Sequence, residues 1–116
     1  MMTAEERGAL DAFVAAVRQH YGVRLVDIFV FGSRARGDAN EDSDVDLAII
    51  LQDGDWTFWT EKLQLSDRVH DALVEHELYI QAWPVRYSEW LDPGKHRNPR
   101  FVASMKRDAR PWAEAA

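Results

Sequence analysis

Two apolar segments, residues 25–31 and 45–51, constrain the fold more than any other feature of this chain. Both are apolar along most of their length, which is typical of strands in the interior of a sheet. Gly32 and Ser33 directly follow the first segment, and an Asp-x-Asp motif opens the second. Ten residues separate Ser33 from that motif. The sequence therefore predicts two central strands with a glycine turn beside one and a pair of carboxylates on the other.

The Asp-x-Asp motif consists of Asp44 and Asp46. Residues two apart on a strand point to the same face, so the two carboxylates are expected side by side. Like charges at that range repel and raise each other's pKa. A hard divalent cation such as Mg²⁺ removes this conflict, because carboxylate oxygens are its preferred protein ligands. We therefore predict that Asp44 and Asp46 are metal ligands.

The Gly32-Ser33 turn is a candidate phosphate site. Glycine allows a sharp bend and a close approach of a ligand to the backbone, and a helix that starts near Ser33 would present N–H groups to an anion. Arg34 and Arg36 follow, and either could bind a triphosphate. Alternatively, the two arginines offset the acidic residues of a polar, solvated loop over residues 38–43. Phosphate beside a carboxylate-bound metal is the arrangement that nucleotidyl transfer needs.

The residues from Phe29 to Leu51 resemble the signature of the DNA polymerase β nucleotidyltransferase superfamily. The sequence Gly-Ser-Arg-Ala-Arg-Gly followed by Ser-Asp-Val-Asp-Leu is similar to the motifs of its minimal nucleotidyltransferase branch. The resemblance implies a polymerase β-like α/β fold, ATP or another NTP as substrate and Mg²⁺ as cofactor. It also implies a third carboxylate on a strand beside the Asp-x-Asp strand.

Glu77 is the only acid in the next predicted strand, residues 77–85, and is the candidate for that third catalytic and metal-binding carboxylate. Leu78, Ile80 and Ala82 should share one side of this strand, with Glu77 and Gln81 on the other. If Gln81 faces the metal instead, the third ligand is missing. The protein would then bind nucleotide rather than catalyse.

Length and composition limit the remaining classes of protein. A chain of 116 residues, 47% of them hydrophobic, suits one domain over residues 1–116. There is no apolar run near the ~20 residues of a membrane helix, no signal-peptide pattern and no cysteine, and we expect a cytoplasmic protein. The net charge of −6 argues against a duplex-binding protein. Residues 95–116 nevertheless carry six basic and two acidic residues, which favours contact with phosphates, RNA or an acidic partner, or else an ordinary solvated helix face.

The periodicity predicts a small mixed sheet flanked by helices. Helices are expected over residues 4–21, preceded by a Thr-Ala-Glu-Glu capping box that starts at Thr3, and over residues 56–75. A further helix is expected to start at Asn98-Pro99 and to end at Pro111. A short helix or turn is expected over residues 33–37. The strands are those already described.

The function we predict from the sequence is Mg²⁺-dependent transfer of a nucleoside monophosphate, AMP from ATP, to an acceptor hydroxyl. The resemblance implies an antitoxin whose partner is a helical HEPN-type toxin and whose acceptor is a tyrosine of that toxin. Two alternatives stay open: a non-catalytic subunit that binds nucleotide or a partner, and a transferase acting on a small molecule. The oligomeric state is also left open.

Overall fold

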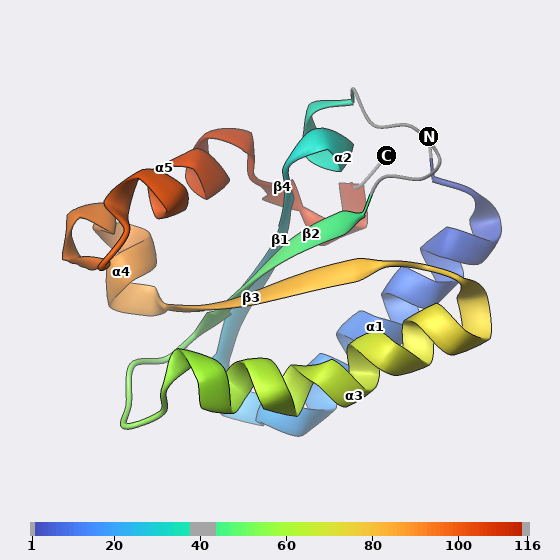
Figure 1. Ribbon diagram of the computed structural model, residues 1–116, viewed down its shortest axis with the longest axis horizontal. Helices are drawn as coiled ribbons and strands as arrows, with labels where there is room; N and C mark the ends of the chain where they lie inside the picture. Colours follow the sequence, from blue (N-terminus) through green and yellow to red (C-terminus); the bar gives the residue numbers. More distant parts are fainter. Residues whose placement is uncertain (1, 38–43, 115–116) are drawn as a thin grey trace.

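The computed structural model describes residues 2–37 and 44–114 (Figure 1). The loop predicted over residues 38–43 lies outside these residues. The elements follow one another as α1 (Ala4–Tyr21), β1 (Leu25–Phe31), α2 (Ser33–Arg36), β2 (Val45–Leu51), α3 (Phe58–His76), β3 (Ile80–Arg86), α4 (Tyr87–Leu91), α5 (Pro99–Asp108) and β4 (Arg110–Pro111). Single 3-10 turns over 22–24, 93–95 and 112–114 complete the order.

The described strands form one mixed sheet in the order β3-β2-β1-β4. β1 and β2 are antiparallel, with Phe31 opposite Asp46, whereas β2 and β3 are parallel, with Gln81 opposite Asp46. The Asp-x-Asp motif therefore lies at the start of the central strand β2. On one side it faces the end of β1, and on the other it faces the start of β3.

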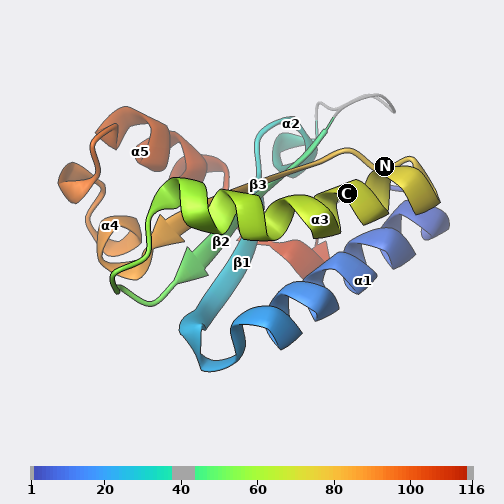
Figure 2. The same cartoon turned by 60° about the horizontal axis from the view of Figure 1, so that its bottom comes forward.

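Helices α1 and α3 lie side by side against one face of this sheet, which we call the α1/α3 face (Figures 1 and 2). Every second residue of β2 points into this layer, and the layer is almost entirely aliphatic. Its buried strand residues are Ile28, Val30, Val45, Leu47, Ile49, Leu51, Ile80 and Ala82. The capping box predicted for α1 is present, with Thr3 and Glu6 exchanging hydrogen bonds of 3.1 and 3.0 Å. The face is closed by two long helices and forms the larger core.

The opposite face, which we call the carboxylate face, carries Asp46. Helices α4 and α5 pack on this face and lie to the left of the strands in Figure 1. Aromatic rings pack here among aliphatic residues, and the rings of Phe29 and Trp90 stack with centroids 5.2 Å apart. The buried residues are Phe31, Ala48, Ile50, Val85, Trp90, Val102 and Met105. Successive residues of β2 thus belong alternately to the core on the α1/α3 face and to the partly covered layer on the carboxylate face.

The mixed α/β architecture predicted from the sequence is confirmed, and α1, β1 and β2 have the bounds expected of them. The third strand was predicted too early: β3 starts at Ile80, not at residue 77. The strand β4 was not predicted, because two residues that include a proline carry no periodic signal. It pairs with Phe29 and Val30 of β1 and completes the sheet.

None of the helices within residues 2–37 and 44–114 is both long enough and apolar enough to cross a membrane.

Candidate active site

The glycine turn and the Asp-x-Asp motif meet directly. Gly32 has φ 74° and ψ −156°, a conformation open to glycine and rarely to other residues. A Cβ atom on Gly32 would lie 2.6 Å from Oδ2 of Asp46. The absence of a side chain at Gly32 therefore makes room for the Asp46 carboxylate. Ser33 begins α2 at this point, so the predicted phosphate turn and the predicted metal ligand share one small space.

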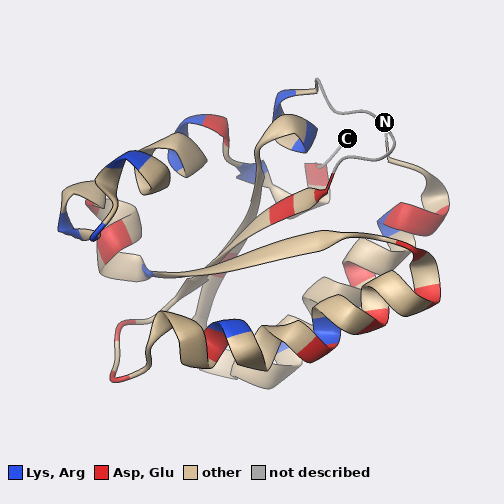
Figure 3. Cartoon of the chain, viewed as in Figure 1, with Lys and Arg blue, Asp and Glu red and all other residues tan. Residues whose placement is uncertain are grey.

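Asp46 has a pKa above its usual range. Burial is the main cause, and the charge of Asp44 adds to it, as the predicted proximity of the two carboxylates requires. A hydrogen bond from Trp83 and the charges of Arg36 and Lys62 act in the opposite direction. Trp83, Arg36 and Lys62 thus favour the charged form of Asp46, but the effects of burial and of Asp44 on its pKa are larger. In Figure 3 the start of β2 is red with acidic residues, and the basic residues of α2 appear in blue near it.

The predicted position of Glu77 on the strand is wrong. Glu77 ends α3 in the left-handed conformation, with φ 54°, and its N–H bonds back to the carbonyl of Leu73 at 2.9 Å. The N–H of Leu78 reaches further back, to Ala72 at 3.3 Å, which closes the helix in the manner of a Schellman motif. That position usually holds glycine, so no local pattern indicated that residue 77 caps the helix instead of starting the strand.

Gln81 occupies the place expected for a third carboxylate, because it is the β3 residue paired with Asp46. Within residues 2–37 and 44–114, no group of three or more His, Cys, Asp and Glu side chains is placed to hold a metal. The donor set still fits Mg²⁺, which is commonly held by one or two carboxylates together with substrate phosphates. Asp44 and Asp46 would supply the carboxylates, and Gln81, paired with Asp46, would add a neutral amide oxygen.

The two arginines predicted to bind nucleotide have carboxylate partners on other elements. Arg34 is 3% exposed and pairs with Glu6 of α1 at 3.1 Å, so its side chain is directed into the protein. Arg36 is half-exposed, pairs with Asp108 of α5 at 2.8 Å and is close enough to lower the pKa of Asp46. Arg34 therefore links α2 to α1, whereas Arg36 lies at the edge of the site.

Sequence reasoning missed Lys62 and Trp83. The Lys62 ammonium lies 4.4 Å from the centre of the Trp83 ring and donates to the carbonyl of Ala82 at 2.5 Å. A signal was present, because Lys62 falls in the helical series Phe58, Lys62, Leu65, Val69, where an apolar residue is expected. A lysine on the inner stripe of a helix indicates a buried polar contact.

A cavity of about 390 Å³ adjoins the site on the carboxylate face. It lies between the start of α3, the middle of β3 and the start of α5. Its lining residues are Thr57, Phe58, Trp59, Trp83, Pro84, Val85, His96, Arg97, Asn98, Phe101, Val102 and Met105. Trp83 lines this cavity and also lies next to Asp46 on the carboxylate face, because it follows Gln81 by two residues on β3. The cavity and the carboxylates therefore border the same side chain.

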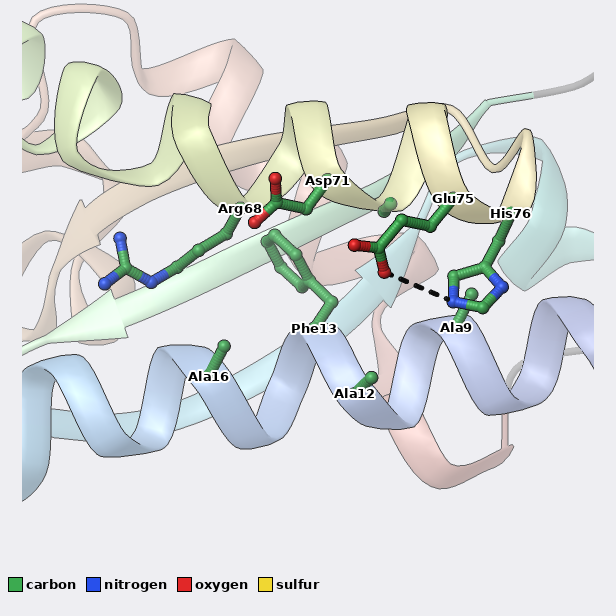
Figure 4. A pocket seen from close by; sticks show the side chains of 9 residues that line it. Ala9, Ala12, Phe13, Ala16, Arg68, Asp71, Glu75 and His76 are labelled. Atoms are coloured by element: carbon green, nitrogen blue, oxygen red, sulfur yellow. Dashed lines mark ion pairs between the residues drawn. The ribbon is translucent and has the colours of Figure 1, made fainter.

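A second hollow, of about 170 Å³, lies between α1 and α3 on the other face of the sheet (Figure 4). Small residues of α1, among them Ala12 and Ala16, line one side of it. Charged residues of α3 line the other side, where Glu75 and His76 are 3.9 Å apart. No residue predicted for the active site reaches this groove.

Comparison with known proteins places this geometry in a family. The profile of the nucleotidyltransferase domain matches residues 10–105. A protein of Methanocaldococcus jannaschii, MJ0604, provisionally named a protein adenylyltransferase, is 38% identical over 76 residues, which are 62% of this chain and 75% of that protein. The protein adenylyltransferase MntA of Thermococcus cleftensis is 44% identical over 54 residues, 46% of this chain and 52% of that protein.

A solved structure from Sulfolobus solfataricus, provisionally assigned as a nucleotidyltransferase, has the same fold. It superposes with a TM-score of 0.59 at 19% identity and covers 72% of this chain and 68% of its own. The family match spans the glycine turn, the Asp-x-Asp strand, all of α3 and α1 from residue 10 onward. The chain belongs to the nucleotidyltransferase domain family and is a nucleotidyltransferase.

Proposed function

We propose that this protein transfers AMP from ATP to a hydroxyl group of another protein, with Mg²⁺ bound at Asp44 and Asp46. The observation that carries the proposal is the contact between Gly32 and the Asp46 carboxylate, because it brings a phosphate turn and a metal ligand together. The names of the relatives, protein adenylyltransferases, support AMP as the transferred group and a protein as the acceptor. We take residues 1–116 as one nucleotidyltransferase domain.

In this proposal the chain acts mainly by positioning. The backbone of Gly32 and the Ser33 hydroxyl bind the outer phosphates of ATP, and Arg36 contributes positive charge from the edge of the site. Asp44 and Asp46, with the Gln81 amide beside them, hold the cation, which neutralises charge on the phosphate oxygens when bound. Asp46 also accepts the proton of the attacking hydroxyl. Glu77 takes no part.

The partner we propose is the HEPN-type toxin implied by the family resemblance, with this protein as its antitoxin. The basic stretch over residues 95–116 gives the acidic body a surface that attracts an acidic segment of a partner. Figure 3 shows this charge on α5. A cytoplasmic location stays a prediction.

The decisive experiment uses ATP labelled separately at the α- and the γ-phosphate. The protein is incubated with Mg²⁺ and the protein encoded beside it, and label is followed on both chains. We expect α-label on the partner, none from γ-labelled ATP, and release of pyrophosphate. Asp46→Asn should lower transfer at least about 100-fold, because loss of a ligand exceeds the 10–100-fold cost of losing an outer partner. The matched control is Asp27→Asn, at an exposed position of β1.

A second candidate function, nucleotide binding without transfer, is favoured by Gln81 in the place of the third carboxylate. It predicts that ATP binds in the presence of Mg²⁺ while neither label appears on any acceptor. Gln81→Asp separates the two cases. A variant that gains transfer where the wild type has none would identify the wild type as a binding subunit.

A further inference from the structure

Three side chains surround the indole ring of Trp83. The ammonium of Lys62 lies 4.4 Å from the ring centre. Phe101 meets the ring edge-on, at 5.3 Å and 78°, and Phe58 lies nearly parallel to it, at 6.2 Å and 27°. Lys62 and Phe58 come from α3 and Phe101 from α5, so elements on both faces of the sheet contact one tryptophan.

Lys62 is itself fixed at a second point. Its ammonium donates to the carbonyl of Ala82, the residue before Trp83, at 2.5 Å. Because α3 packs on the α1/α3 face and β3 is an edge strand of the described sheet, the Lys62 side chain reaches around the sheet edge. Burial lowers the pKa of Lys62 and the charge of Asp46 raises it. The Lys62 ammonium is therefore close enough to Asp46 for the two charges to interact.

Trp83 stands beside Asp46 on the carboxylate face. Gln81 pairs with Asp46 and Trp83 pairs with Ala48, so both β3 residues point to the same side as Asp46. Trp83 is therefore the diagonal neighbour of Asp46, and its indole N–H, which can only donate, is close enough to lower the pKa of that carboxylate. Gly32 lies against Oδ2 of the same group. The carboxylate is thus bordered by Gly32 and by Trp83.

We propose that Trp83, clamped by Lys62, Phe58 and Phe101, is a positioning residue that fixes the Asp46 carboxylate for its cation. The proposal rests on the proposed function of Asp46 as a metal ligand. The clamp is needed because Trp83 also lines the neighbouring cavity. That space lets the ring turn away from Asp46 once its neighbours are removed, and a freely turning carboxylate binds metal poorly.

The test compares Trp83→Phe with Trp56→Phe. Trp56 is a matched control, because Arg86 stacks on its ring at 4.2 Å and its N–H bonds to a backbone carbonyl rather than to the site. Binding of Mn²⁺ without nucleotide is measured by electron paramagnetic resonance, and transfer by steady-state kinetics. We expect Trp83→Phe to weaken Mn²⁺ binding and lower kcat by about 10–100-fold each, with little change in KM for ATP and no change in the control.

Lys62→Met should act in the same direction with a smaller loss, and its control is Arg86→Met. Lys62→Arg should restore both measurements, because arginine also stacks on aromatic rings and donates hydrogen bonds. Wild-type Mn²⁺ affinity in Trp83→Phe would overturn the proposal, as would equal losses in Trp56→Phe. A rise in KM for ATP alone would do the same, since it would indicate a contact with nucleotide. If the wild type transfers no label, the proposed function fails, yet the Mn²⁺ comparison still decides the role of Trp83.

Discussion

The two faces of the sheet differ in what their side chains have to do. The α1/α3 face is aliphatic and closed by two long helices. The carboxylate face mixes aromatic with aliphatic side chains, is partly covered by α4 and α5, and carries Asp46 with its raised pKa. Burial of apolar groups stabilises the first face, whereas the second face retains a half-buried charge that burial opposes. One strand serves both purposes, because its alternate residues belong to different layers.

The largest effect is expected from neighbouring substitutions in β2. Ile49 and Ile50 are both fully buried but point to opposite faces. Ile49→Ala should lower the free energy of unfolding by about 2–5 kcal/mol and leave Mn²⁺ affinity unchanged in the folded protein. Ile50→Ala should cost a similar amount and also weaken Mn²⁺ binding severalfold, because Ile50 belongs to the cluster against which Trp83 packs. Urea denaturation and Mn²⁺ titration measure the two effects; equal Mn²⁺ affinities would remove the distinction between the faces.

A smaller loss of stability with a complete loss of activity is expected from Gly32→Ala. The new Cβ would meet Asp46 Oδ2, and the backbone at φ 74° is strained for alanine, at a cost of about 1–3 kcal/mol. Nucleotide transfer should be abolished because Asp46 must move. Gly8→Ala is the control, since nothing lies within 4 Å of a Cβ there. Full activity of Gly32→Ala would contradict the contact on which the proposed function depends.

The smallest effect concerns Glu77, where the chain passes from α3 to the strand that carries Trp83. Glu77→Gly should raise the free energy of unfolding by roughly 0.5–1 kcal/mol, because glycine adopts left-handed backbone without strain, partly offset by its greater freedom when unfolded. Transfer should be unchanged. Thermal denaturation and the labelling assay test both statements, and a sharp fall in turnover would return Glu77 to the active site.

The sequence was most informative where local chemistry and periodicity agreed. The capping box and the apolar series fixed α1, and the contrast between polar motifs and apolar runs fixed β1 and β2. The end of α3 was predicted to within one residue, but the start of the next strand was placed at Glu77, three residues before β3 begins. Glu77 caps the helix in a left-handed conformation without being glycine, so no local pattern indicated this. Lys62 and Trp83 were missed because their relation spans two elements and follows from the register of β3, which no local pattern specifies.

Glu6 has a consequence for how this site can change. One oxygen of its carboxylate accepts from the backbone of Thr3 at the start of α1, and the other from the buried Arg34, 28 residues away. The first turn of α1 and the turn that follows Gly32 are therefore both hydrogen-bonded to the Glu6 carboxylate. Substitutions at the beginning of the chain can shift the phosphate turn while leaving every residue of that turn as it was, which offers variation a route to alter nucleotide affinity from outside the site.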